Sequence, residues 1–370
     1  MIKLAMNSRL TTNASVKIYF DDDKWIINNL LSKTTLETDY KTAIILISFM
    51  NGSTIENTYS IFSYYFSIQT EDYLKFVEKL LEADFLQAED NASNMWVKKV
   101  LTDWNRYGWR KAADYHILTY DYPFWDYKQG GREADREIME EYAKKEKDFN
   151  RGKKYKNIEK EINTPSPISI LKKFDTPFKM SYKKELTNFN VEKTKILMSL
   201  VFGVLRTRTV PDSNNRKNLV RKINPSGGSR HPSEGYLFNL SIEGLEKGIY
   251  HYSSITSTLD YLKDIPSNPQ LRELFPGLYR APFEPQAFIV ITSVFERNMY
   301  RYREPRTFRT IFMDVGHIIE NIDKICNYLG LDNFQHQGIE DRLVESILDI
   351  NYLEEGAIMG IAVGGKNDKK

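Results

Sequence analysis

The chain is poor in the residues that cross-link a fold or ligate a metal. Cys326 is the only cysteine, and there are five histidines among 370 residues. A single cysteine excludes an intramolecular disulfide, and a cysteine-based zinc site needs several thiolates. We therefore expect neither a disulfide framework nor a metal site.

Long apolar runs and an excess of one charge are also missing. No segment approaches the roughly 18 uninterrupted apolar residues of a membrane helix, and residues 1–10 lack the apolar block of a signal peptide. The chain has 52 basic and 50 acidic residues, a formal net charge of +2. This balance argues against a general nucleic-acid binder. The sequence predicts a cytoplasmic protein without a membrane or nucleic-acid partner.

The size and the composition of the chain predict more than one domain. At 370 residues, of which 41% are hydrophobic, it exceeds the usual size of a single core. From Arg132 to Glu161 the sequence is dense in lysine and glutamate, which is typical of a solvated helix, and the turn 164–167 follows. We expect a module over 1–100, an aromatic and charged helical connector over 101–164, and a larger domain over 165–370.

The first module has the pattern of a winged-helix-like unit. Residues 16–20 favour a strand, and the apolar residues of 73–85 recur at helical spacing. It is similar to the domains that hold leader peptides in ribosomal-peptide biosynthesis, which implies binding by strand addition. A packing or dimerisation element and a DNA reader are the alternatives. Against DNA, the helix offers only Lys75 and Lys79, which acidic residues outnumber.

Residues 96–127 are unusually aromatic. Such a segment can line a substrate channel, or it can pack between domains. His116 with Asp121 nearby could form an acid–base pair, although a lone histidine is more often structural.

A glycine-rich motif carries the most specific signal. Pro225-Ser226-Gly227-Gly228 is followed by Arg230-His231-Pro232-x-Glu234-x-Tyr236, and then by Gly248-Ile249-Tyr250-His251-Tyr252. Adjacent glycines permit a tight turn that presents successive N–H groups to a phosphate or a polarised ring edge. By local chemistry alone, such a turn could equally be a simple connection. Residues 236–242 favour a strand.

This paired motif resembles the signature of SagB-type dehydrogenases, over about residues 165–365. The resemblance implies an α+β nitroreductase-like domain, with an antiparallel-type sheet flanked by helices. This domain follows the winged-helix-like module in the sequence. It also implies FMN as cofactor, bound at the interface of a homodimer. The substrate would be the core of a ribosomally made precursor peptide, whose leader the first module would hold.

The resemblance also assigns the cofactor contacts. They fall on the motif turn and its surroundings: Pro225, Ser226, Gly227, Gly228, Ser229, Arg230 and Arg309. A loop over 333–338 would cover the flavin, with the N–H of Gln337 or Gly338 polarising its ring. The family's Arg-Arg-Ser-x-Arg motif for the phosphate is replaced by a lysine-containing segment, 172–179. The phosphate charge could instead meet other basic residues: Arg206, Arg208, Arg216, Arg221, Arg230, Lys366, Lys369 and Lys370.

The expected catalytic residues precede a long helix. Relatives that oxidise azolines carry a Lys-Tyr pair before an Arg-x-Tyr-Arg run, whereas this chain has Arg301-Tyr302. Arginine is a poor proton acceptor, so we expect Tyr302 to be the base, with its pKa lowered by neighbouring guanidinium groups such as Arg301. The arginines could alternatively form a solvated or phosphate-facing surface. The helix should run from Phe308 to a stop at Gly330 and pair across the dimer, with His317 as a buried packing residue.

These residues predict an FMN-dependent peptide dehydrogenase that converts azoline to azole or desaturates a related group. Partner enzymes that modify the same peptide are expected. A flavin-less scaffold subunit and a dehydroamino-acid reductase of the same fold are the alternatives, and a small-molecule nitroreductase fits the long N-terminal extension less well.

Overall fold

The chain divides into two compact units, Met1–Phe124 and Trp125–Lys370. The structure is a computed structural model, and it describes residues 4–147, 151–173, 185–208, 219–351 and 353–366. The division lies inside the expected connector 101–164 rather than at either of its ends. The helices α4 and α5 belong to the first unit, and α6 to the second.

In its described part, residues 4–124, the first unit combines two small antiparallel sheets with five helices. Its elements are β1 (Arg9–Thr12), β2 (Val16–Asp21), β3 (Lys24–Asn29), β4 (Thr34–Thr38), α1 (Tyr40–Ser48), β5 (Ser53–Thr54), α2 (Ile55–Tyr65), α3 (Thr70–Glu82), β6 (Leu86–Ala88), α4 (Ala92–Asn105) and α5 (Arg110–Leu118). The sheets have the strand orders β5-β1-β6 and β2-β3-β4.

Local chemistry explains the main elements of this unit. Asp22 and Asp23 both have positive φ, which produces the tight turn between β2 and β3. The helix α3 buries Tyr73, Val77 and Leu80, which lie on one face at the spacing expected from the sequence. They pack with residues of α1, α2 and β6 in a single core.

The second unit is built on one large sheet. Its elements are α6 (Gly131–Lys145), β7 (Glu161–Asn163), α7 (Pro167–Leu171), α8 (Val191–Phe202), β8 (Val204–Arg208), β9 (Leu219–Lys222), β10 (Ser233–Asn239), β11 (Gly248–Ser253), β12 (Thr258–Lys263), α9 (Asn268–Leu274), β13 (Ala287–Val294), α10 (Glu296–Met299), α11 (Phe308–Leu329), β14 (Asp332–His336), α12 (Asp341–Ile347) and β15 (Glu355–Gly364). Short 3-10 turns lie at Gly227–Ser229, Leu278–Arg280 and Pro305–Thr307.

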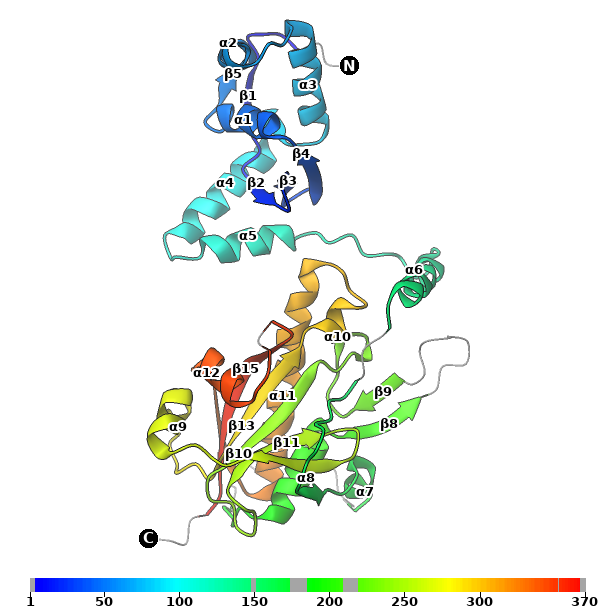
Figure 1. Ribbon diagram of the computed structural model, residues 1–370, viewed down its shortest axis with the longest axis vertical. Helices are drawn as coiled ribbons and strands as arrows, with labels where there is room; N and C mark the ends of the chain where they lie inside the picture. The colour runs from blue at the N-terminus through cyan, green and yellow to red at the C-terminus, as the bar shows by residue number, and fades with distance from the viewer. Residues whose placement is uncertain (1–3, 148–150, 174–184, 209–218, 352, 367–370) are drawn as a thin grey trace. The chain divides into compact units, whose positions relative to one another are not determined.

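The sheet has seven strands in the order β14-β15-β13-β10-β11-β12-β7, and neighbours are antiparallel throughout (Figure 1). Every residue of β10 is buried, because β13 and β11 pair with its two edges and helices cover its two faces. The α+β class and the antiparallel sheet expected from the sequence are confirmed.

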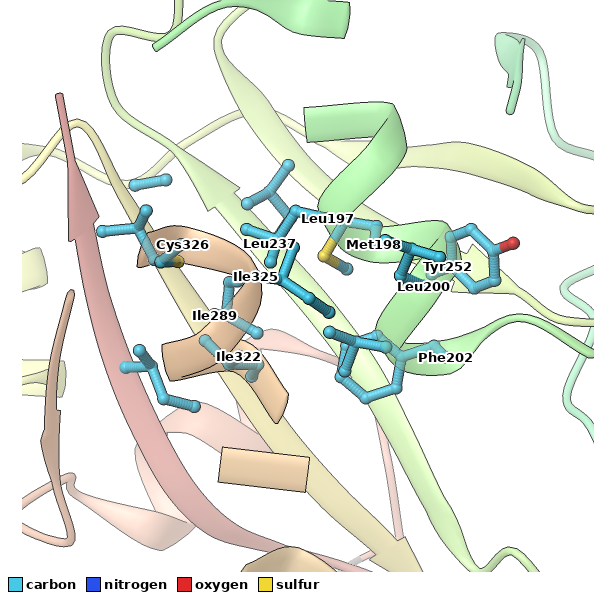
Figure 2. Packing of buried hydrophobic residues seen from close by; sticks show 14 of the residues in the cluster. Leu197, Met198, Leu200, Phe202, Leu237, Tyr252, Ile289, Ile322, Ile325 and Cys326 are labelled. Carbon is cyan, nitrogen blue, oxygen red and sulfur yellow. The ribbon is translucent and has the colours of Figure 1, made fainter. Parts of the chain in front are cut away.

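Successive side chains of a strand point to opposite faces of the sheet. Each strand therefore contributes to two cores. Leu237 of β10 and Ile289 of β13 belong to the core formed with α8 and α11. Figure 2 shows both meeting Ile322 and Ile325 of α11. Their neighbours Phe238 and Phe288 point the other way, into the core with α9 and α12.

The long helix α11 ends where the sequence predicted, at Gly330 with φ 68°. The segment expected as a flavin-covering loop over 333–338 differs, because Asp332–His336 pairs along β15 as strand β14. Only Gln337 and Gly338 continue as a loop. No helix in the described ranges is both long enough and apolar enough to span a bilayer.

Candidate functional site

The Pro-Ser-Gly-Gly motif forms a rigid turn at the start of β10. Gly228 has φ 57°, Ser229 φ 53° and His231 φ 48°, so three positions within four residues are left-handed. Only glycine adopts this conformation without strain. The turn must therefore be stabilised by contacts outside its own backbone.

Most N–H groups of this turn bond inside the protein. Ser229 donates to Ser226 O, Arg230 donates to Gly227 O, and His231 donates to Ser226 Oγ. Gly228 is exposed, and its N–H has no partner among the described residues. Among the described residues, the expected row of open N–H groups is thus reduced to two, those of Ser226 and Gly228.

Asp314 of α11 anchors this turn. Its carboxylate accepts from Ser226 Oγ at 2.7 Å and from Gly227 N at 3.2 Å. Burial raises the pKa of Asp314 above its usual value, and these two hydrogen bonds oppose the shift.

Tyr302 lies directly on the glycine pair. A Cβ atom added to Gly228 would be 2.2 Å from Tyr302 Oη, and one added to Gly227 would be 2.3 Å from Thr310 Cγ2. Side chains at these two positions would displace the neighbours, so both must be glycine. The structure thus brings together the expected base and the expected flavin turn, which are more than 70 residues apart in sequence.

Arg301 is directed away from the turn. Its guanidinium donates to both carboxylate oxygens of Asp135 in α6, at 3.0 and 2.8 Å. The guanidinium carbon lies 5.2 Å from the Tyr302 ring centroid. Burial alone would lower the pKa of Arg301, but Tyr302 and Asp135 outweigh it, and the pKa is raised. Arg301 is therefore a cation fixed beside the ring of Tyr302.

A buried charge network supports the other end of the turn. Arg297 contacts Glu234 at 2.6 Å and donates to His231 O at 3.0 Å. His251 Nε2 lies 3.0 Å from the second oxygen of Glu234. Burial would raise the pKa of Glu234, but Arg297 and His251 together hold it well below its usual range.

The expected ligand Arg230 belongs to the same support. It is 2% exposed, donates from Nε to Arg297 O, and lies with its guanidinium carbon 5.3 Å from the Tyr300 ring centroid. Of the motif, only Pro225 and Gly228 are exposed.

Two titratable groups beneath the turn have strongly shifted pKa values. Burial, opposed in part by Glu234, lowers the pKa of Lys222 to about 8. Burial and the Lys222 ammonium lower the pKa of His231 to about 3. His231 is therefore neutral near pH 7, and its Nε2 bonds to Val220 O at 3.0 Å.

A second polar cluster lies at the same end of the sheet. Lys153 Nζ contacts Glu355 at 2.7 Å and Tyr236 Oη at 2.9 Å. Glu355 also accepts from Tyr236 Oη at 2.9 Å and from Thr292 at 2.6 Å, and Tyr155 Oη lies 3.0 Å from Tyr236 Oη. This cluster attaches the segment after α6 to the sheet. The motif residues Glu234, Tyr236 and His251 thus form the internal support of the site, a role the sequence did not assign them.

Gln337 and Gly338 lie apart from the Pro-Ser-Gly-Gly turn of the same chain. They follow β14, and three inter-strand steps separate β14 from β10, which corresponds to about 14 Å. The N–H of Gly338 donates to His336 Nδ1 at 2.7 Å. One chain therefore does not bring these two expected flavin contacts together.

The other expected residues have varied positions. Arg309 is partly buried in the first turn of α11, next to Thr310. Arg216, Lys369, Lys370 and most of the lysine-containing segment 172–179 lie outside the described residues. His317 is exposed on α11, so its expected burial is wrong for the single chain. In the first unit, His116 stacks on Trp104 with centroids 5.2 Å apart, as a packing residue does.

A pocket of about 710 Å³ opens beside Tyr302. Its wall includes Phe295, Met299, Phe308 and Ile311. A volume in this range suits a drug-sized or peptide-sized ligand. The site therefore combines a flat glycine turn, a phenol hydroxyl on that turn, and an adjacent apolar pocket.

Comparison with known proteins shows which proteins this chain resembles. The trifolitoxin-processing protein TfxB of Rhizobium leguminosarum bv. trifolii is 30% identical over 261 residues, which are 68% of this chain and 70% of that protein. The microcin B17-processing protein McbC of Escherichia coli is 26% identical over 155 residues, 41% of this chain and 57% of that protein. A chain of the E. coli microcin synthetase McbBCD complex with truncated pro-MccB17 bound aligns with a TM-score of 0.41 at 19% identity, over 76% of this chain and 100% of that one. No family model matches the sequence.

The similarity to TfxB extends over about two thirds of both proteins, which is enough to assign this chain to a family. The chain belongs to the SagB-type family of nitroreductase-fold proteins, whose members TfxB and McbC process ribosomally made peptides.

Proposed function

We propose that this protein is an FMN-dependent oxidoreductase that dehydrogenates a residue of a ribosomally made precursor peptide. The observation that carries the proposal is the contact between Tyr302 Oη and Gly228 in the Pro-Ser-Gly-Gly turn. It puts a group able to exchange a proton against a surface suited to a planar ring, in a chain whose relatives process peptides.

The residues of the turn fit the flavin ring better than they fit its phosphate. Pro225 and Gly228 are exposed and carry no long side chain, so a planar ring can pack on them. The N–H of Gly228, unpartnered in the described part of the chain, is available to a ring oxygen or nitrogen. The cationic guanidinium of Arg230 is buried within the support of the turn, which leaves the phosphate to residues elsewhere.

When bound, FMN supplies the acceptor for a hydride. The chain itself must receive the proton that leaves the substrate carbon, and Tyr302 Oη as phenolate is the group next to the turn that can do so. Arg301, held by Asp135, keeps a positive charge beside the Tyr302 ring. The substrate loses two hydrogens in total.

A homodimer would complete the site. Gly338 and the glycine turn are separated within one chain, so a second copy is needed if both are to contact one flavin. On the exposed side of α11 lie Phe312 and Met313, which are 50% and 58% exposed. An apolar helix face of this kind is suited to a symmetric interface.

The first unit would hold the leader of the precursor. In its described part, β2 and β4 are the edges of the sheet β2-β3-β4, and each pairs with β3 alone. An extended peptide can add to such an edge through backbone hydrogen bonds. Azole formation and other desaturations remain alternative outcomes of the same chemistry at the core.

Two readouts test this proposal. The purified protein should be yellow with a flavin absorption band, and incubation should lower the mass of its peptide by two hydrogens. Tyr302→Phe should abolish turnover while flavin binding is retained. A colourless protein that resists FMN loading would support the scaffold alternative, and a gain of two hydrogens would support the reductase.

A further inference from the structure

The strands β8 and β9 form a two-stranded ribbon that is not part of the large sheet (Figure 1). A β-bulge interrupts their pairing: Val204 lies opposite Lys222, but Arg206 lies opposite Arg221. Regular antiparallel pairing from Val204 would instead place Leu205 opposite Arg221. The extra residue therefore brings a second arginine to Arg221, and bulges of this kind often re-aim a side chain next to a functional site.

Arg206 and Arg221, which we call the ribbon arginines, face each other without an acidic partner. Side chains directly opposite one another in an antiparallel pair lie on the same face, with Cβ atoms about 5 Å apart. Both residues are exposed, and within the described part of the chain neither side chain makes an ion pair or a hydrogen bond. Like charges in this position oppose the pairing of the strands. An anion bound between them would remove the repulsion.

Other arginines around the glycine turn differ in this respect. Arg297 forms an ion pair with Glu234, and Arg301 forms one with Asp135. Arg230 is 2% exposed and bonds to the backbone of the support under the turn. The charges of these residues are engaged inside the protein. The ribbon arginines are exposed, so a ligand can reach them.

The ribbon is held close to the glycine turn. On its inner side, Val220 O lies 3.0 Å from His231 Nε2. Asn224, between the ribbon and the turn, is buried and bonds to both α8 and α11. Pro225 follows Arg221 by four positions, which an extended chain spans in at most about 14 Å. A ligand whose ring packs on the turn can therefore reach the ribbon arginines with a short flexible chain.

The chemistry of two guanidinium groups indicates the charged group of that ligand. Each guanidinium is planar and offers paired N–H donors to two oxygens of an oxyanion. A phosphate monoester has three acceptor oxygens and more than one negative charge near pH 7, so both guanidinium groups can bind it together. A carboxylate has one charge and is satisfied by one guanidinium. Two facing arginines therefore fit a phosphate monoester better.

We propose that Arg206 and Arg221 bind a phosphate monoester, which for a flavin on the glycine turn is the phosphate of FMN. The inference rests on the proposed function for this source of the phosphate, and a separate phosphorylated ligand is the other source. The ribbon arginines then take the role of the Arg-Arg-Ser-x-Arg motif that the sequence does not contain.

The test compares FMN with riboflavin, which lacks the phosphate. The affinity of the full-length protein for each is measured by quenching of flavin fluorescence. We expect FMN to bind about tenfold or more tightly than riboflavin, because a hydrogen bond between charged groups contributes a factor of this order. Arg206→Gln and Arg221→Gln should each weaken FMN by about tenfold and leave riboflavin unchanged. If both variants retain the FMN-to-riboflavin ratio of the unaltered protein, the inference is overturned.

A control variant and a stability measurement exclude a merely structural role. Arg272→Gln also removes one exposed guanidinium, but on α9, and should leave the ratio unchanged. Without ligand, the two ribbon variants should have thermal midpoints no lower than that of the unaltered protein, since each removes a like-charge contact. A clear loss of stability in the ligand-free variants would contradict the repulsion on which the inference depends.

Inorganic phosphate separates this inference from the proposed function. It should compete with FMN and not with riboflavin, and acetate that competes equally well would overturn the assignment to a phosphate. Equal affinities of the unaltered protein for FMN and riboflavin would overturn the ribbon site and retain the flavin. If neither flavin binds, calorimetric titration with phosphate decides: binding that both ribbon variants lose retains the site for another phosphorylated ligand and removes the flavin proposal, whereas no binding overturns both.

Discussion

At the scale of single residues, Asp314 has the largest effect on the glycine turn. One carboxylate satisfies both Ser226 Oγ and Gly227 N–H, and Ser226 Oγ in turn accepts from His231 N at 2.9 Å. Three left-handed residues are thereby held in place from a neighbouring helix.

Replacement of Asp314 by alanine should therefore destabilise the turn. Two partly buried donors would lose their acceptor, which costs about 1–3 kcal/mol. We expect a lower urea midpoint of unfolding and weaker FMN binding, and Asp314→Asn should lose less because it keeps one acceptor. Glu273→Gln, at an exposed position of α9, is the control and should change neither quantity. Unaltered FMN affinity in Asp314→Ala would show that the turn is not the flavin site.

His231 should make stability depend on pH. Its pKa is about 3 in the folded state against an ordinary value near 6.5, because burial, Lys222, Arg151 and Arg297 disfavour the cation. Between these values the unfolded chain binds a proton that the folded chain does not, so stability decreases as pH falls from 6.5 toward 3.

The thermal midpoint measured from pH 7 to pH 4.5 checks this. In His231→Gln, which can still donate to Val220 O, the decrease should be shallower. Identical slopes for the two proteins would contradict a buried neutral histidine.

At the scale of elements, a salt bridge stabilises the end of the sheet that lies next to the glycine turn. Lys153 and Glu355 are 202 residues apart in sequence and meet at 2.7 Å, with Tyr236 and Thr292 bonded to the same carboxylate. The Glu355 side chain is 7% exposed. It needs its counter-ion, because an unpaired buried charge is strongly unfavourable.

Lys153→Met should destabilise the second unit by about 2–3 kcal/mol, less than for a fully buried pair because the lysine remains partly accessible. The double variant Lys153→Met/Glu355→Gln should recover part of the loss, since the uncompensated charge is gone. Chemical unfolding of both variants and of Glu355→Gln alone completes a double-mutant cycle. Additive effects within about 0.5 kcal/mol would contradict the coupling.

The sequence predicted the helices and strands in which apolar residues recur with a clear period. Residues 236–242 were expected as a strand and overlap β10, and the helix expected from Phe308 is α11 with its stop at Gly330. The pattern failed at Asp332–His336, where polar residues on an edge strand were taken for a loop. On an edge, pairing with β15 decides the conformation and local composition does not.

The contacts that stabilise the site were harder to predict. The contacts of Glu234 with Arg297, and of Lys153 with Glu355, depend on which strands and segments lie side by side. That information is in the strand order and register, which one sequence does not contain. Family resemblance assigned roles to Tyr302 and to the glycine turn, but it did not predict the contact between them.

At the scale of the whole molecule, the exposed face of α11 should decide the oligomeric state. Met313 is 58% exposed and lies on this face with Phe312. Met313→Glu would place a charge in the proposed interface, which opposes association. We expect light scattering to show a dimer for the unaltered protein and a monomer for Met313→Glu, with FMN binding weakened in parallel.

Tyr64→Glu, at an exposed apolar position of α2 in the first unit, is the matched control and should stay dimeric. If the unaltered protein is monomeric and still binds FMN, this would contradict a flavin site shared by two chains.

The whole account depends on the flavin packing against the Pro-Ser-Gly-Gly turn. The most direct measurement is a titration of the protein with FMN, followed by quenching of flavin fluorescence, in the unaltered chain and in Gly228→Val. A valine there would require a strained left-handed backbone and would collide with Tyr302 Oη. We predict one FMN per chain for the unaltered protein and loss of binding for Gly228→Val. Equal binding by the two proteins, or none by either, would contradict the claim.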